Sequence, residues 1–329
     1  MPKTLHTKLA LLSGAAFLAC TGHPAATAAA ASTPTLTIAP ALINTAALHT
    51  RMLAAAHAGA RIVAVGDHGV VLLSDDGGKT FRQSQQVPIA STLTAVSFAD
   101  AHTGWAVGHW GAILKTTDGG EHWSLQRHDT SVDQPLFSVY FRTPEEGWAV
   151  GLWSLMLHTT DGGATWSTVP VSPPGAKLAR NLYAIFAGAN GALYVACEQG
   201  RVLRSSDDGK TWDSIDTGYA GSFWTGAALE DGTLLVAGLR GTVYRSTDGG
   251  THWQPAKTPF KSSVTALVAV AERSVVAVGL DGISMSSRDD GASFTGRQRP
   301  DRTALTAAVV GAGRSVVVFS ANGPEVLAR

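Results

Sequence analysis

Thr116-Thr-Asp-Gly-Gly-Glu-His-Trp123 is one of six copies of a short turn with the pattern [S/T]-x-D-x-G-x-[T/S/H]-[W/F], known as an Asp box. The copies are Ser74–Phe81, Thr116–Trp123, Thr159–Trp166, Ser205–Trp212, Ser246–Trp253 and Ser287–Phe294. Their aspartates are separated by 42, 43, 46, 41 and 41 residues. A repeat of about 40–50 residues that contains short strand-like segments is typical of a β-propeller blade of four strands. The sequence therefore predicts an all-β propeller.

The repeat that spans residues 93–127 shows the expected order of strands. Residues 93–98 alternate between apolar and polar side chains, and residues 105–108, 112–116 and 123–127 form three further strand-like runs. Gly, Asp and Asn separate these runs, as in an antiparallel meander. The same order recurs over residues 136–169, 182–215, 223–255 and 264–297.

The repeated aspartate of each box has a structural explanation. An Asp side chain can accept hydrogen bonds from amides of its own turn, and a Gly supplies the positive φ that the turn needs. The closing Trp or Phe is expected to bury its ring between neighbouring sheets. We therefore expect a structural role, with calcium binding as the alternative, for Asp76, Asp118, Asp161, Asp207, Asp248 and Asp289.

The blade count comes to seven. A seventh box is due about 41 residues after Asp289, but residues 305–310, 315–319 and 325–327 supply three strands and no box. The alternating segment Thr35–Ala39 precedes the first complete repeat. We predict a seven-bladed ring in which an N-terminal strand near residues 34–42 joins the C-terminal blade and closes the seventh sheet. Closure of this kind removes unpaired strand edges.

Composition limits the function. The 329 residues are 45% hydrophobic, and 25 Lys and Arg balance 25 Asp and Glu. A neutral chain without a basic face excludes a typical nucleic-acid binder. The unbroken repeat predicts one domain over residues 32–329, which we expect to be a monomer.

Residues 1–31 resemble a secretory signal peptide that is removed. Lys3 and Lys8 precede an apolar run from Leu9 to Ala19, which is too short to span a bilayer. The protein is expected to be exported to the periplasm or to a thylakoid lumen. Cys20 follows the apolar run, so a lipoprotein with a lipid anchor there is the alternative, and membrane contact is otherwise expected to be peripheral. Cys197 is the one remaining cysteine and is expected to be a small buried thiol.

The turns between the second and third strands are the first candidates for a binding surface. They open on the face of the ring opposite the boxes, and unlike the boxes they differ from blade to blade. Loops that break a repeat's symmetry on a rigid scaffold are functional candidates, although ordinary solvated turns look the same in sequence. These pairs are Asp67-His68, His109-Trp110, Leu152-Trp153, Glu198-Gln199, Leu239-Arg240, Leu280-Asp281 and Ala321-Asn322.

A second asymmetry lies at the start of the first strand of each repeat. Three successive repeats carry an aromatic residue where others carry Thr, in the series Thr94, Phe137, Tyr183, Trp224, Thr265 and Thr306. With Trp110 and Trp153 they can form an arc of rings, unless they simply pack between blades. The long connection 170–181, with Lys177 and Arg180, adjoins this arc. The candidate partner-binding residues are Phe137, Tyr183, Trp224, Trp110, Trp153, His68, His109, Glu198, Arg240 and Arg180.

The sequence holds no close metal-ligand spacing such as HxH or HExxH, and we expect no metal and no cofactor. The alternative is a metal site at the channel mouth. The residues that could meet there are His68, His109, Asp67, Glu198 and Asp281.

The phrase Gly104-Trp-Ala-Val-Gly-His-Trp-Gly-Ala-Ile-Leu-Lys-Thr-Thr-Asp-Gly-Gly-Glu-His-Trp123, repeated with variation over Gly147–Trp166, closely resembles the photosystem II stability/assembly factor family. The resemblance implies an exported, non-catalytic, seven-bladed Asp-box propeller that binds a protein or peptide, a subunit of an envelope or thylakoid membrane complex, during assembly. Phototrophic members carry an arginine-rich patch. Here Arg127, Arg142, Arg180 and Arg240 are scattered, so the patch is not carried over.

Sialidases also carry Asp boxes, and they make a glycan-binding protein or a sialidase-like glycoside hydrolase the alternative function. A carboxylate pair for such chemistry would come from Asp67, Glu198 and Asp281. The blade count and the lack of an R-I-P segment near the start disfavour an enzyme, and we expect none.

Overall fold

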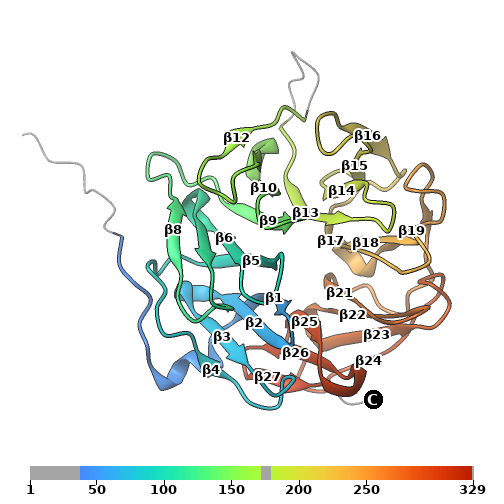
Figure 1. The fold of residues 1–329 in the computed structure, drawn as a ribbon. Helices are drawn as coiled ribbons and strands as arrows, with labels where there is room; N and C mark the ends of the chain where they lie inside the picture. The colour runs from blue at the N-terminus through green and yellow to red at the C-terminus, as the bar shows by residue number, and fades with distance from the viewer. Residues whose placement is uncertain (1–37, 172–178, 328–329) are drawn as a thin grey trace, which may run out of the picture. The chain divides into compact units, whose positions relative to one another are not determined.

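The computed structural model describes residues 38–171 and 179–327. These residues form seven antiparallel sheets arranged around a central axis (Figure 1), which confirms the predicted seven-bladed propeller. No helix in the described part of the chain is long and apolar enough to cross a membrane. Residues 1–37, with the expected signal peptide and Cys20, and residues 172–178 lie outside the described residues.

Six blades have four strands each, and each blade is contiguous in sequence. The strands of blades 1 to 3 are β1 (Met52–Ala58), β2 (Arg61–Gly66), β3 (Val71–Ser74), β4 (Arg82–Gln83), β5 (Leu93–Phe98), β6 (Gly104–Gly108), β7 (Ile113–Thr116), β8 (Ser124–Arg127), β9 (Leu136–Phe141), β10 (Gly147–Gly151), β11 (Met156–Thr159) and β12 (Ser167–Thr168). Those of blades 4 to 6 are β13 (Leu182–Ala187), β14 (Leu193–Cys197), β15 (Arg201–Ser205), β16 (Asp213–Asp216), β17 (Phe223–Ala228), β18 (Leu234–Gly238), β19 (Val243–Ser246), β20 (Gln254–Pro255), β21 (Val264–Ala271), β22 (Ser274–Gly279), β23 (Ile283–Ser287) and β24 (Thr295–Gln298).

Blade 7 has three strands in the described residues. They are β25 (Leu305–Val310), β26 (Val316–Ser320) and β27 (Gly323–Val326). Five short 3-10 helices occupy turns between second and third strands: η2 (Asp67–Gly69), η3 (His109–Gly111), η4 (Leu152–Ser154), η5 (Leu239–Gly241) and η6 (Leu280–Gly282). Two more lie elsewhere: η1 (Thr45–His49) precedes β1, and η7 (Ala312–Arg314) lies between β25 and β26.

The ring closes through its inner wall. The first strand of each blade packs against the first strand of the next, and β25 packs against β1 in the same way. Met52 and Ile62 of blade 1 share a buried apolar cluster with Val317 and Phe319 of blade 7. Side-chain burial between the first and last blades therefore closes the ring.

The prediction that residues near 34–42 complete the seventh sheet is wrong for the residues that the structure describes. Residues 38–42 form no strand and run beside the first blade (Figure 1). The Ala41 amide donates to the Val87 carbonyl at 3.0 Å, and the Gln83 side chain donates to the Leu42 carbonyl at 2.8 Å. Pro40 has no amide to donate to a ladder. Because blade 1 takes these backbone groups, they are not available to β27.

The Asp boxes have the predicted local geometry. In blade 3, Oδ1 of Asp161 accepts the Thr165 amide at 2.9 Å and the Thr159 hydroxyl at 2.7 Å, and Oδ2 accepts the Thr165 hydroxyl at 2.6 Å. These bonds lower the pKa of Asp161 to about 2, the Thr165 side chain having the largest effect. Equivalent bonds form in the other five boxes. In two of them, the boxes of Asp118 and Asp248, a ring nitrogen of His122 or His252 takes the place of the Thr hydroxyl.

Each box also joins its blade to the preceding one. The glycine at the fifth position of each box lies against the second strand of the preceding blade, so that a Cβ at Gly209 would lie 2.5 Å from Nε1 of Trp148. The box main chain receives hydrogen bonds there too, as when Trp105 Nε1 donates to the Gly162 carbonyl at 3.1 Å. The glycine and the residue that it contacts pair as Gly78 with Val317, Gly120 with Val63, Gly163 with Trp105, Gly209 with Trp148, Gly250 with Tyr194 and Gly291 with Leu235.

Candidate functional site

The candidate site lies on the face opposite the boxes, which we call the connection face because the links between blades run across it. Antiparallel order places these links and the turns between second and third strands on this face. The amide after each second strand donates to a link, as when His109 donates to the Thr92 carbonyl at 3.0 Å and Leu239 to the Ser222 carbonyl at 3.0 Å. The predicted rim positions therefore share one face.

The middle residue of the rim turn adopts a left-handed backbone in blades 1 to 6. The φ values are 57° for His68, 59° for Trp110, 55° for Trp153, 58° for Gln199, 58° for Arg240 and 56° for Asp281. This region is uncommon for residues other than glycine and costs about 1–2 kcal/mol each. The turn therefore holds these side chains outward at an energetic cost, and His68, Trp153 and Arg240 are exposed.

The residue after this position is a tightly packed glycine in most blades. A Cβ at Gly69 would lie 2.0 Å from the Ile89 carbonyl oxygen, and a Cβ at Gly241 would lie 2.0 Å from that of Phe260. Blade 3 differs because Ser154 stands here, with φ 60°. Its amide donates to the Arg180 carbonyl at 2.6 Å, and its hydroxyl accepts the Arg180 amide at 2.9 Å. Arg180 thus bonds to a serine where other blades have a packed glycine.

Cys197 is the second exception at the same connection. The glycine at this position in other blades touches the preceding link, so that a Cβ at Gly108 would lie 2.1 Å from the Thr92 carbonyl oxygen. In blade 4 the equivalent residue is Cys197, which is buried as predicted. Burial raises the pKa of its thiol to about 12, so the thiol is unreactive at neutral pH.

The aromatic series falls on a β-bulge in every blade. The pairing between first and second strands shifts at this position, for example between Leu182 and Ala184 in blade 4. Thr94 uses the bulge to donate to the Leu136 carbonyl of the next blade at 2.5 Å. Thr265 donates to the Leu305 carbonyl at 2.6 Å, and Thr306 to the Met52 carbonyl at 2.5 Å. A bulge re-aims one side chain, here toward the adjacent blade at the channel mouth.

Blades 3 to 5 give up this inter-blade bond. Phe137 and Trp224 have no hydroxyl, and the Tyr183 hydroxyl donates instead to Oε1 of Glu198 at 3.2 Å. The rings of Phe137 and Tyr183 stack with centroids 5.4 Å apart. All three aromatic side chains are half-buried, so they present part of each ring to the solvent. Blade 1 also lacks the bond, because Leu53 holds this position. The run of aromatic side chains in three adjacent blades therefore favours a binding role, rather than the absence of the bond.

A polar network joins the candidates of blades 3 and 4. Glu198 accepts the Asn181 amide at 3.0 Å and the Asn181 side chain at 2.7 Å. Oδ1 of Asn181 in turn accepts the Trp153 amide at 3.1 Å. Burial raises the pKa of Tyr183, an effect that the Asn181 hydrogen bond opposes and the Glu198 charge reinforces. Asn181 thus links Trp153, Tyr183 and Glu198, although sequence analysis did not select it as a site residue.

The structure brings together five of the ten predicted binding residues, which we call the rim arc: Phe137, Trp153, Arg180, Tyr183 and Glu198. Trp153 has 55% of its surface exposed. Arg180 donates from Nε to the Gln199 side chain at 3.2 Å. Trp224 continues the series in the next blade. Part of the long connection, including Lys177, lies outside the described residues.

The remaining candidates lie in separate turns. His109 contacts Asp133 at 3.3 Å, and Trp110 is half-buried beside it. His68 and Arg240 are exposed on blades 1 and 5.

The carboxylates proposed for catalysis each have local partners. Asp67 pairs with Arg51 at 2.9 Å, and Asp281 accepts the Ser262 hydroxyl at 2.7 Å. No group of three or more His, Cys, Asp or Glu suited to a metal occurs among the residues that the structure describes.

Comparison with known proteins identifies the family. The family model described as photosynthesis system II assembly factor YCF48 matches residues 82–259. The chain belongs to the YCF48 family. A curated relative, the photosystem II assembly protein Ycf48 of Thermosynechococcus vestitus, is 39% identical over 130 residues. That match covers 40% of this chain and 37% of the relative, so the chain spans little more than a third of the relative that it matches.

Solved YCF48 structures have the same fold. One, described as YCF48 bound to D1 peptide, superposes with a TM-score of 0.67 at 17% identity over 88% of this chain and 98% of that chain. YCF48 from Cyanidioschyzon merolae gives a TM-score of 0.65 at 15% identity over 84% of this chain and 94% of that one. At this identity the likeness concerns the fold alone. The family-model match and the curated relative confirm the resemblance to the photosystem II assembly factor family.

Proposed function

We propose that this YCF48-family protein is a non-catalytic propeller that binds an extended protein segment on the rim arc. By holding that segment, it assists the assembly or stability of a membrane complex of the envelope or thylakoid. The observation that carries the proposal is the replacement of the inter-blade Thr bond by Phe137, Tyr183 and Trp224 in three successive blades beside the exposed Trp153. The D1 peptide named for a solved relative supports a peptide ligand.

The chemistry of the rim arc suits a polypeptide. Half-exposed rings offer apolar contact area at low conformational cost, and the Glu198 and Arg180 side chains beside them offer polar contacts. Rigid aromatic anchors of this kind dominate many interfaces.

Capture of partners from native membranes tests the proposal. The combined substitution Trp153→Ala, Tyr183→Ala and Trp224→Ala should abolish capture of a membrane-complex subunit and leave Tm largely intact. Leu280→Ala, which truncates an exposed apolar side chain in the rim turn of blade 6, is the matched control and should capture normally. A large fall in Tm with unchanged capture would instead assign the rings to packing. Turnover of aryl glycosides that Glu198→Gln stops would favour the glycosidase alternative.

We also propose that residues 1–31 direct export and that residues 32–329 form the mature domain. The charged start and short apolar run support a cleaved leader. N-terminal sequencing of the protein from its host tests this: a start near residue 32 is expected, whereas retention of Met1 would contradict it. A lipid-modified Cys20 at the new terminus would identify the lipoprotein form.

A further inference from the structure

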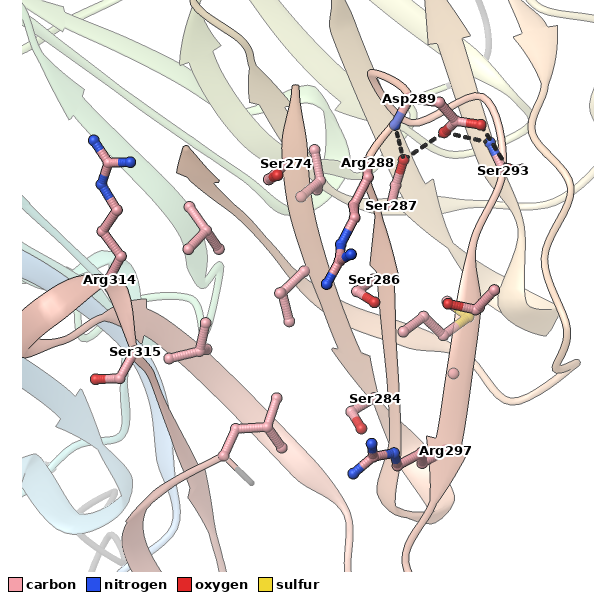
Figure 2. Close-up of a pocket in the computed structure, with 18 residues that line it drawn as sticks. Ser274, Ser284, Ser286, Ser287, Arg288, Asp289, Ser293, Arg297, Arg314 and Ser315 are labelled. Atoms are coloured by element: carbon pink, nitrogen blue, oxygen red, sulfur yellow. Dashed lines mark hydrogen bonds between the residues drawn. The ribbon is translucent and has the colours of Figure 1, made fainter. Parts of the chain in front are cut away.

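A cavity of about 890 Å³ lies between blades 6 and 7 (Figure 2), whereas the rim arc belongs to blades 3 and 4. Val275, Val276 and Met285 of blade 6 and Val316 and Leu327 of blade 7 form its apolar lining. Serine hydroxyls add polar groups, and Figure 2 shows Ser284 and Ser286 along the β23 side. We call this cavity the blade 7 slot.

The slot marks the place that a box and an outer strand fill elsewhere. In six interfaces the glycine at the fifth position of a box covers the first residue of the V-A-x-G phrase on the preceding blade, as Gly291 covers Leu235. The equivalent residue of blade 6 is Val276, and no box of blade 7 covers it in the described residues. The box aromatic that packs there in other blades, such as Phe294 against the cluster of Leu235 and Val243, is missing from the same described part of blade 7.

Two further features mark the slot: the first distinguishes it from blades 2 and 5, and the second from all the other blades. Lys115 and Arg245 donate to carbonyls of the next box, at 3.0 Å to Gly162 and 2.8 Å to Asp290, and Ser286 holds their position in blade 6. Within the described residues, strand β27 pairs with β26 on one side, whereas every other third strand also pairs with a fourth. The open edge of β27 can therefore accept a strand.

The charge of the slot is positive at the end that lies on the box face. Arg288 of blade 6 and Arg314 of blade 7 line it on opposite sides (Figure 2), and both side chains are exposed. The Asp289 carboxylate beside them is occupied within its own box by the Ser287 and Ser293 hydroxyls. Glu325 is occupied by Arg299. The electrostatic complement of this end is an acidic group.

We propose that the blade 7 slot binds an extended segment of a partner protein by β-strand addition to β27. The segment places a large apolar side chain against Val276 and Met285 and a carboxylate near Arg288 and Arg314. In this way the partner supplies what a box and fourth strand supply in the other six blades. This second surface is independent of the rim arc and of the function proposed for it.

A peptide copied from the chain itself tests the proposal. Residues 116–127, T-T-D-G-G-E-H-W-S-L-Q-R, contain a box and its fourth strand, and the labelled peptide can be titrated into the full chain by fluorescence anisotropy. We expect saturable binding and slowed hydrogen exchange at β27. Arg288→Glu combined with Arg314→Glu should weaken binding by about tenfold or more. Arg302→Glu, an exposed arginine on the connection face, should leave it unchanged.

Other outcomes would overturn the proposal. Undiminished binding to the double variant would show that the two arginines do not contribute to binding. Equal affinity for a peptide with Asp→Asn, Glu→Gln and Trp→Ala would show that the slot does not recognise the acidic and aromatic side chains of the peptide. Binding that appears only in a chain lacking residues 1–37 would assign the slot to the protein's own amino-terminal segment. Loss of binding in the Trp153, Tyr183 and Trp224 variant, with the slot intact, would place the peptide on the rim arc instead.

Discussion

The hydroxyl of Thr306 in the last blade donates to the carbonyl of Met52 in the first at 2.5 Å. Thr94 and Thr265 make the same bond to the next blade within the ring. The junction between the two ends of the propeller thus repeats an ordinary inter-blade contact. Closure does not depend on strand exchange within the described residues.

Thr306→Val should therefore destabilise the protein as much as Thr94→Val does. Each removes a side-chain hydrogen bond to a main-chain carbonyl, for an expected loss of about 1 kcal/mol. Urea unfolding of the two variants provides the comparison. If Thr306→Val were silent while Thr94→Val was costly, the two ends would be held by something other than this inner wall.

The glycine contact between blades predicts a difference between two Gly→Ala variants. Gly209 and Gly218 both have left-handed φ values, 76° and 79°, but a Cβ at Gly218 meets nothing within 4 Å. Gly218→Ala should cost about 1–2 kcal/mol from the backbone alone. Gly209→Ala should cost about 1–3 kcal/mol more, because its methyl group collides with Trp148. Equal losses in free energy of unfolding would argue against the box as an inter-blade contact.

The box aspartates predict acid sensitivity. Hydrogen bonds within each turn lower the pKa of Asp161, Asp207, Asp248 and Asp289 to about 2, below the ordinary value of 3.8. A lowered pKa in the folded state stabilises the fold above pH 3.8, and this contribution is lost as pH falls toward 2.

In thermal unfolding, the box aspartates should therefore have little effect on how Tm varies with pH above pH 5. Between pH 4 and pH 2 their protonation should lower Tm. Asp161→Asn should lower Tm at pH 7 and make its fall in acid shallower. A variant whose acid profile matches that of the natural chain would show that Asp161 contributes nothing to it.

The network around Tyr183 predicts shifts of opposite sign. Burial raises the pKa of its phenol, and the Glu198 charge raises it further. Glu198→Gln should lower the pKa of Tyr183, and Asn181→Ala should raise it, because the Asn181 side chain donates to the phenolic oxygen at 3.4 Å. NMR titration of 13C-labelled tyrosine, assigned with Tyr183→Phe, measures both. Shifts of the same sign would contradict these hydrogen-bond directions.

The periodic part of the sequence was sufficient to predict the fold. The boxes recur because each must place a carboxylate, two backbone positions with positive φ and an aromatic ring in the same geometry. The same residue types therefore appear at the same spacing, and the six copies can be recognised from the sequence. Within the described residues the predicted closing strand does not form, because alternation in Thr35–Ala39 does not reveal which blade takes the backbone bonds of the following residues. The Ala41 bond to Val87 depends on tertiary packing.

The candidate site was predicted in part. Tyr183 and Trp153 stood out because they break the repeat. Asn181 holds the position of Thr92 and Ser222 in other blades, and a polar residue there gave no signal of its own. Ser154 and Cys197 did carry a signal, since both replace a repeated glycine. Ser154 bonds to Arg180 of the long connection, and Cys197 pairs with Leu182 directly after it. The network among them required coordinates.

Photo-crosslinking tests the central claim most directly. A benzoylphenylalanine placed at position 153, on the rim arc, should crosslink in the host to one membrane-complex subunit. The same probe at Lys210, exposed in the box of blade 4, should not crosslink to it. Crosslinks to that subunit from position 210 and none from position 153 would contradict the rim arc as the binding surface.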